Sequence, residues 1–113
     1  MGMFSKLFGG SANDSPRERA RKLSDDGVRA ASANNAAKAK QAWRDAIEAD
    51  PTWSVPYFNI AKLALDEKNM NDAEQYLLRA EAAAKKRLSS EDEQVLKGIE
   101  IGKVRLALRK PSH

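Results

Sequence analysis

The chain has 113 residues, a net charge of +4 and no cysteine. This length corresponds to one domain, and the absence of cysteine excludes disulfides, thiolate metal ligands and cysteine nucleophiles. The single histidine is the last residue, His113. The common nucleophile-and-base arrangements therefore cannot be assembled, and we expect no enzyme, no catalytic residue, no metal site and no cofactor.

The positive charge is unevenly distributed along the chain. Residues 1–84 carry twelve basic and twelve acidic side chains, whereas residues 85–113 carry eight basic and four acidic ones. A basic C-terminal piece can bind nucleic acid or an acidic protein surface, or it can simply favour the helix dipole. No aromatic residue stands among these cations to stack on bases, which disfavours nucleic acid. The cations concerned are Lys97, Lys103, Arg105, Arg109 and Lys110.

Residues 1–15 are predicted to form a flexible N-terminal segment. Met3, Phe4, Leu7 and Phe8 are apolar at near-helical spacing, and a stretch rich in glycine, serine and asparagine follows. This pattern fits a disordered tail, a short amphipathic turn that contacts a membrane through Phe4, Leu7 and Phe8, or a tethered peptide that docks in the protein's own groove. No run approaches the ~20 apolar residues of a membrane span, and no secretory signal is present, so we expect a cytoplasmic protein.

Five helices and no strands are predicted after this segment. The first runs from about Pro16 to Ser32, with a capping box at Ser15 and Glu18. The second runs from about Ala36 to Ala49, after the break at Asn34 and Asn35. The others are a third helix from about Ser54, a fourth with Asn71 as its cap that extends to Arg87, and a fifth with Ser90 as its cap over 90–109.

Small and large residues recur along these helices at a constant offset, since 73 − 39 = 34 and 61 − 27 = 34. Two antiparallel helices approach most closely where both lack bulk, so small residues at the contact and large ones beside it indicate a close-packed hairpin. The recurring positions are Gly27, Ala39, Trp43, Ala46 and Pro51 in the first copy, and Ala61, Ala73, Leu77 and Ala80 in the second.

This pattern resembles the tetratricopeptide repeat, a helix–turn–helix unit of about the same period. The matching units are residues 20–53 and 54–87, although Asp26, Ala30, Ala64 and Lys85 depart from the signature. The resemblance implies an all-α, right-handed α-α superhelix of two hairpins. The last helix, 90–109, does not continue the signature and is expected to act as a capping helix. The repeat-like domain would then cover residues 16–110, with a tail at 111–113.

The family generally binds peptides in the concave groove that the first helix of each hairpin lines. The resemblance therefore implies a non-catalytic adaptor for a protein or peptide partner. The positions that would face the groove are Arg21, Ser24, Val28, Ala31, Val55, Phe58, Asn59, Lys62 and Leu65.

Two interpretations of the second half of this set stay open at this point. Val55, Phe58 and Leu65 lie on a different face from the predicted core residues, so they would form an exposed apolar patch. In one interpretation the patch binds a peptide, with Asn59 bonding its backbone and Lys62 meeting an acid. In the other, the fifth helix or the N-terminal segment covers the patch.

Two further functions remain as alternatives: a membrane-peripheral assembly factor that uses the N-terminal segment, and a nucleic-acid-binding accessory that uses the basic last helix. Self-association also stays open, because the chain has fewer than the three repeats that stacks of this kind usually need. The last helix carries apolar residues on two sides, Val95 and Ile99 on one and Ile101, Val104 and Leu108 on the other. Such a helix packs against two neighbours or forms a subunit contact.

Overall fold

The computed structural model describes residues 15–109, and this part of the chain folds into five α-helices with no strand. The predictions for the N-terminal apolar residues, Lys110 and His113 lie outside the described residues. The helices are α2 (Pro16–Ser32), α3 (Ala36–Ala49), α4 (Ser54–Asp66), α5 (Met70–Arg87) and α6 (Ser90–Arg109). The prediction of an all-α chain is therefore confirmed for these residues.

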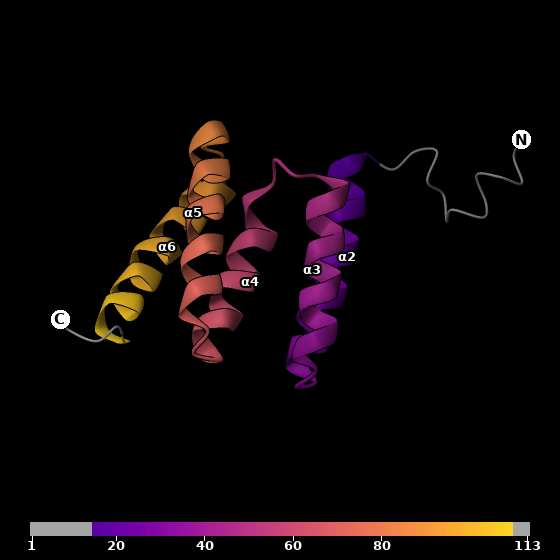
Figure 1. Cartoon of the computed structure of the whole chain (residues 1–113). Helices are drawn as coiled ribbons and strands as arrows, with labels where there is room; N and C mark the ends of the chain where they lie inside the picture. Colours follow the sequence, from indigo (N-terminus) through magenta and orange to yellow (C-terminus); the bar gives the residue numbers. More distant parts are fainter. Residues whose placement is uncertain (1–14, 110–113) are drawn as a thin grey trace, which may run out of the picture.

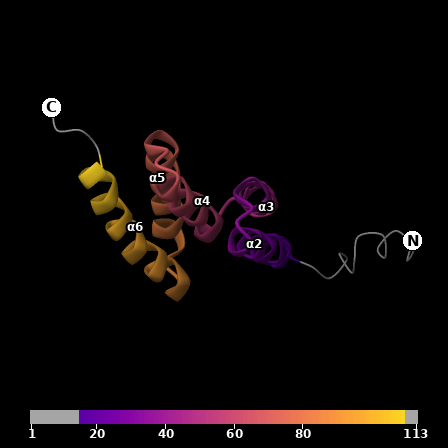
Figure 2. The same ribbon diagram turned by 90° about the horizontal axis from the view of Figure 1, so that it is seen from below.

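The helices follow one another in chain order across the molecule (Figures 1 and 2). α2 packs along α3, and α4 packs along α5, each pair being joined by a short turn. α4 also contacts α3, and α6 packs against both α4 and α5. The two helix pairs meet where Ile60 of α4 joins Ala39 and Trp43 of α3 in one apolar cluster.

The first two helices begin and end where the local sequence predicts. Ser15 accepts a hydrogen bond from the Glu18 amide, and the Glu18 carboxylate accepts one from the Ser15 amide, which completes the capping box. Pro16 follows as the first helical residue, where its missing N–H costs nothing. At the end of α3, Asp50 precedes Pro51 and the helix stops at Ala49.

The turns between paired helices repeat the same geometry at equivalent positions of the two pairs. Asn34 and Lys68 both have positive φ, 62° and 61°, and the next residues, Asn35 and Asn69, cap α3 and α5 with their side chains. The amides of these two caps donate to the carbonyls of Ala30 and Ala64, each at 2.8 Å. The predicted cap at Asn71 is therefore wrong by two positions, because the left-handed turn at Lys68 ends α4 early enough for Asn69 to cap.

The predicted cap of the last helix is also displaced, by one position. Ser89 rather than Ser90 performs this role, since its Oγ accepts from the Asp92 amide at 3.1 Å. The Asp92 carboxylate in turn accepts from the amide and hydroxyl of Ser89. A shorter acidic side chain thus replaces the glutamate of the usual box, and it does so while buried.

The small residues occur where large side chains lie against the backbone. Gly27 faces the indole of Trp43, so that a Cβ at Gly27 would lie only 2.7 Å from Trp43 Cδ1. In the second pair Ala61 and Ala73 are fully buried in one cluster with Leu77. Both observations fit the predicted close approach of the paired helices.

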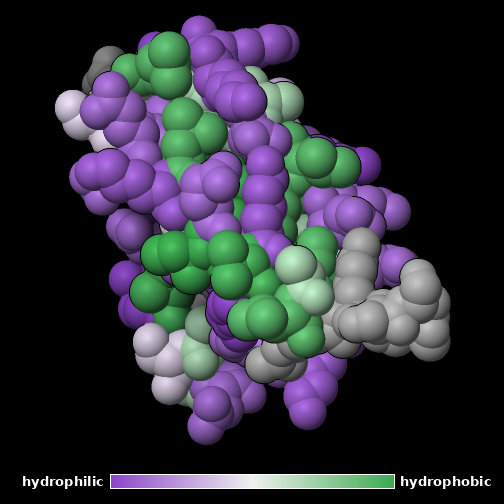
Figure 3. Space-filling model, turned by 90° about the vertical axis from the view of Figure 1, so that its left-hand side faces the viewer, coloured by the Kyte–Doolittle hydropathy of each residue, from purple (hydrophilic) through white to green (hydrophobic). Residues whose placement is uncertain are grey.

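α6 buries only one of its two apolar sides. Val95, Ile99 and Leu106 belong to the cluster shared with α4 and α5, and Gly102 allows Leu77 to approach. The outer side keeps Ile101, Val104 and Leu108 exposed by 65%, 58% and 80%. Figure 3 views the molecule from this side and shows hydrophobic side chains among hydrophilic ones at the surface. This outer side differs from that of a purely solvating cap, which would be polar.

The end of α5 carries a leucine in a conformation that favours glycine. Leu88 has φ 53° and ψ 37°, and its side chain is 56% exposed. A left-handed conformation costs an ordinary residue about 1–2 kcal/mol, and glycine avoids this cost. Glycine also increases the conformational entropy of the unfolded chain, which cancels part of the gain in stability. We expect Leu88→Gly to raise the free energy of unfolding by about 0.5–1 kcal/mol, measured by urea denaturation.

Leu78 provides the matched control for this substitution, since it is 57% exposed but lies inside α5. There, Leu78→Gly should lower the free energy of unfolding by about 1 kcal/mol. A loss of stability for Leu88→Gly similar to that for Leu78→Gly would contradict the left-handed assignment.

Candidate functional site

Two of the predicted groove residues are buried instead of facing a partner. Leu65 is 1% exposed and belongs to the core between α4, α5 and α6. Ser24 is also buried, and its carbonyl accepts a hydrogen bond from Trp43 Nε1 at 3.1 Å. The prediction that these two residues face an open groove is therefore wrong, because the core shared with α5 and α6 encloses Leu65, and Trp43 of α3 lies against Ser24.

The apolar patch of α4 is covered by α6. Phe58 and Val55 are half-buried against the cluster that contains Val95 and Ile99. The ring of Phe58 lies on Gly98, where an added Cβ would be 2.9 Å from Phe58 Cε2. Of the two interpretations left open by the sequence, coverage by the fifth helix is the one that these contacts support. Val55 and Phe58 are accordingly not available as an exposed patch.

The remaining predicted residues meet at a cleft between α2 and α4 of about 360 Å³. Val28 and Ala31 line it from α2, whereas Asn59 and Lys62 line it from α4. Its other lining residues are Ser32, Trp43, Leu63 and Asp66. Val28 is 48% exposed although it is apolar. The cleft thus combines an apolar surface with polar groups that can orient a ligand.

The polar side chains of this cleft differ in whether they already form an ion pair or a hydrogen bond within the chain. Asp66 is paired with Arg105 of α6 at 2.9 Å. Lys62 places its Nζ 5.0 Å from the ring centre of Phe58, but it forms no ion pair with another residue of the range 15–109. The carboxamide of Asn59 likewise has no hydrogen-bond partner within that range. Asn59 and Lys62 can therefore bind a ligand without first breaking an ion pair or hydrogen bond.

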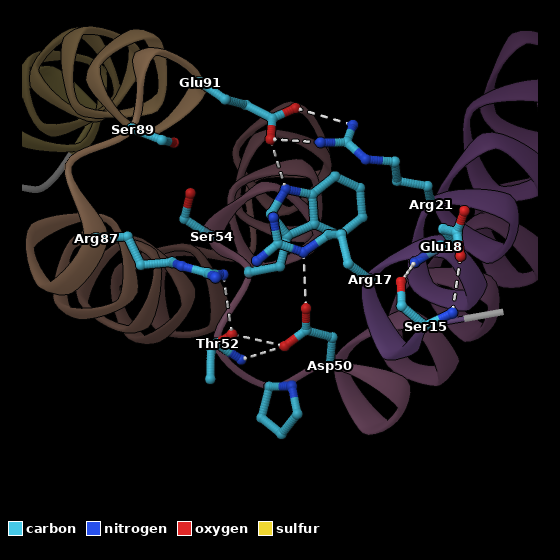
Figure 4. A network of polar contacts seen from close by, with 12 residues as sticks. Ser15, Arg17, Glu18, Arg21, Asp50, Thr52, Ser54, Arg87, Ser89 and Glu91 are labelled. Carbon is cyan, nitrogen blue, oxygen red and sulfur yellow. Dashed lines mark hydrogen bonds and ion pairs between the residues drawn. The ribbon is translucent and has the colours of Figure 1, made fainter. Parts of the chain in front are cut away.

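Arg21, another predicted groove residue, belongs to the polar network of Figure 4, together with Arg17, Asp50 and Glu91. Its guanidinium lies 4.9 Å from the Trp53 ring centre and donates to Glu91 of α6 at 3.2 Å. Trp53 Nε1 donates to the same Glu91 oxygen at 2.8 Å. Arg17 covers the ring as well, at 5.3 Å. The network connects α2 with α6, so Arg21 positions helices and is not a free partner-binding group.

Asp50 forms the other half of this network. Arg17 Nε donates to its carboxylate at 2.7 Å, and the hydroxyl of Thr52 donates at 2.6 Å. Burial raises the pKa of Asp50, but the hydrogen bonds from Thr52 and Arg17 outweigh burial, so the pKa lies below its ordinary value. The carboxylate stays charged and holds the loop after α3 against α2.

Two glycines in the sequence indicate which side of α6 packs against the other helices, although the apolar residues of α6 do not. Gly98 and Gly102 are four positions apart, on the side of the helix that approaches Phe58 and Leu77. The pair of Arg21 with Glu91, by contrast, joins residues 70 positions apart. No local pattern predicts such a pair.

Two of the basic residues of α6 form ion pairs within the fold. Lys103 is bonded to Glu81 at 3.0 Å, and Arg105 to Asp66. Hydrogen bonding to Glu81 raises the pKa of Lys103. Between residues 15 and 109 there is no helix long and apolar enough to cross a membrane, and no cluster of acidic or histidine side chains suited to a metal ion.

The fold and the cleft define a helical protein with an open cleft between its two helix pairs, α2–α3 and α4–α5. Comparisons with protein-family models, curated proteins and solved structures found no match to this chain.

Proposed function

We propose that this protein is a cytoplasmic, non-catalytic adaptor that binds a peptide segment of a protein partner in the cleft between α2 and α4. In this proposal residues 20–53 and 54–87 are two tetratricopeptide-like units of a right-handed superhelix, and α6 closes the stack. The observation that carries the proposal is the cleft itself, which brings together Val28, Asn59 and Lys62 from two helices.

Each of these residues has a separate role in the proposed binding. The exposed Val28 and the neighbouring Ala31 provide apolar area that a peptide side chain covers. Asn59 offers both a donor and an acceptor to a peptide backbone, as a neighbouring strand would. Lys62 pairs with an acidic side chain of the peptide, which sets its register.

The two alternative functions have less support. The nucleic-acid alternative depends on basic residues of α6, of which Lys103 and Arg105 already bind acidic side chains. The membrane alternative depends on Phe4, Leu7 and Phe8, outside the described residues. For self-association, the surface that we propose is the outer side of α6, where Ile101, Val104 and Leu108 are exposed.

The adaptor proposal predicts a specific loss of partners when a charge enters the cleft. We expect Val28→Glu to weaken partner binding by about tenfold or more, because the peptide would have to remove water from a carboxylate where it now covers an apolar side chain. Lys62→Glu should lose those partners that offer an acid to this position. Affinity capture from a cell extract, followed by mass spectrometry, measures both losses.

Val104→Glu is the matched control, since Val104 is exposed on α6 and lies outside the cleft. This variant introduces the same charge in place of the same side chain and should retain the partners. If Val28→Glu and Lys62→Glu both keep every partner, the cleft is not the binding site, whether or not Val104→Glu loses any of them.

A further inference from the structure

We infer that the chain's own N-terminal segment, with Phe4, Leu7 and Phe8, occupies the cleft between α2 and α4 when no partner is bound. The inference rests on the proposed function, because it names an internal ligand for the same cleft. The apolar side chains of the segment and the exposed Val28 would each lose water on docking.

The length of the segment allows it to reach the cleft. The cleft residues Val28 and Ser32 lie 13 and 17 positions after Ser15 on α2, which corresponds to about 20–26 Å along the helix. An extended chain from Ser15 back to Phe4 spans up to about 38 Å, and the shorter stretch back to Leu7 spans up to about 28 Å. The residues between Phe8 and Ser15 include Gly9 and Gly10, which permit the reversal of direction that docking along α2 needs.

The residues of the segment also suit the cleft chemically. Phe4, Leu7 and Phe8 have the spacing i, i+3 and i+4, so one helical turn would present all three on one side. The cleft offers Val28, Ala31, Trp43 and Leu63 as its apolar lining. Lys6 lies off the apolar stripe of the segment, so its charge can stay in water when the stripe is covered.

The exposed apolar side of α6, with Ile101, Val104 and Leu108, is farther from the segment than the cleft is. The pair of Arg21 with Glu91 places the first turns of α2 and α6 near each other, so Leu108 lies about 27 Å farther along α6. Two helix spacings of about 8–10 Å separate α2 from α6, which puts Leu108 at least about 30 Å from Ser15. Of these two surfaces, the cleft is thus the one that the segment reaches with the shorter tether.

Attachment to α2 raises the local concentration of the segment to the order of 1 mM. A segment that binds with a dissociation constant of about 0.1 mM as a free peptide would then fill about nine tenths of the clefts. An outside peptide would have to displace it, and its apparent affinity would be about tenfold lower than for a chain whose segment cannot dock.

A paramagnetic label on the segment tests this inference in the full chain. Because the chain has no cysteine, Ser5→Cys gives a single site for a nitroxide, and Ser5 lies off the apolar stripe. Amide signals of the uniformly ¹⁵N-labelled protein are compared before and after reduction of the nitroxide. We expect strong signal loss at Val28, Ala31 and Asn59, and none at Ile101 or Val104. The control chain carries Phe4→Ala, Leu7→Ala and Phe8→Ala together with the label, and there the loss at the cleft should disappear.

Three results would overturn the inference. The first is signal loss confined to the first turn of α2 in both chains, and the second is signal loss on the outer side of α6. The third is signal loss in a ¹⁵N-labelled chain without a nitroxide when it is mixed with a nitroxide-labelled chain, because that result means docking between copies. No partner is present in this experiment, so a negative result would not contradict the adaptor proposal. That proposal is tested separately, by the capture experiment with Val28→Glu. The two proposals therefore fail on different measurements.

Discussion

Gly27→Ala is expected to lower the free energy of unfolding by about 2 kcal/mol, although alanine is normally the better helix residue by about 1 kcal/mol. A Cβ at this position would lie 2.7 and 2.8 Å from Cδ1 and Cε2 of the Trp43 indole. The indole cannot retreat freely, because it is buried and its Nε1 donates to the Ser24 carbonyl. Urea denaturation of the two chains measures the change.

A second background separates this clash from any other effect of the substitution. In a Trp43→Leu chain the ring is absent, so adding Gly27→Ala should be neutral or should stabilise by up to about 1 kcal/mol. An equal loss in both backgrounds would show that the ring of Trp43 does not limit the approach of α2 to α3.

Asp92→Ala is expected to destabilise the fold by about 3 kcal/mol, since it removes three hydrogen bonds and leaves a buried donor behind. Asp92 is 2% exposed, and its carboxylate accepts from Ser54 Oγ at 2.7 Å and from the amide and hydroxyl of Ser89 at 3.1 and 2.8 Å. Ser54 is fully buried, so its hydroxyl would lose its acceptor. The neighbouring Glu93 is exposed, and Glu93→Ala should change stability by less than about 0.5 kcal/mol.

The effect of Asp92→Ala should also depend on pH. Burial raises the pKa of Asp92, but the hydrogen bonds from Ser54 and Ser89 outweigh it and hold the pKa below its ordinary value. The stabilisation is therefore fully present above the unfolded pKa of about 3.9 and is lost as the pH falls through the folded pKa. The difference between the two chains should stay constant from about pH 8 to about pH 5 and shrink below about pH 4. A difference that grows in acid would contradict the assignment.

Local turn chemistry explains why most helix ends could be predicted. Pro16 and the Asp50–Pro51 step act over a short stretch of chain, so no knowledge of the fold is needed to place them. The two errors, at Asn71 and Ser90, arose where several adjacent polar residues can all serve as caps. The constant offset between the two units resolves the first of them, since it relates Asn34 and Asn35 to Lys68 and Asn69.

The site could be predicted only in part, because a helix far along the chain decides which residues stay exposed. Val28, Asn59 and Lys62, which the repeat register assigned to the groove, line one cleft. The register could not predict that α6 would cover Phe58 and bury Leu65. That outcome depends on which side of α6 packs inward, and long-range packing of this kind leaves only a weak trace in the sequence, the spacing of Gly98 and Gly102.

The most direct test of the binding proposal is to locate a captured partner on the surface. A peptide from such a partner is titrated into the ¹⁵N-labelled chain, and the amide shifts are followed. The proposal predicts that the largest shifts occur at Val28, Ala31, Asn59 and Lys62, and that Val28→Glu weakens binding by about tenfold or more. Largest shifts at Ile101, Val104 and Leu108, with unchanged binding to the Val28→Glu chain, would contradict it.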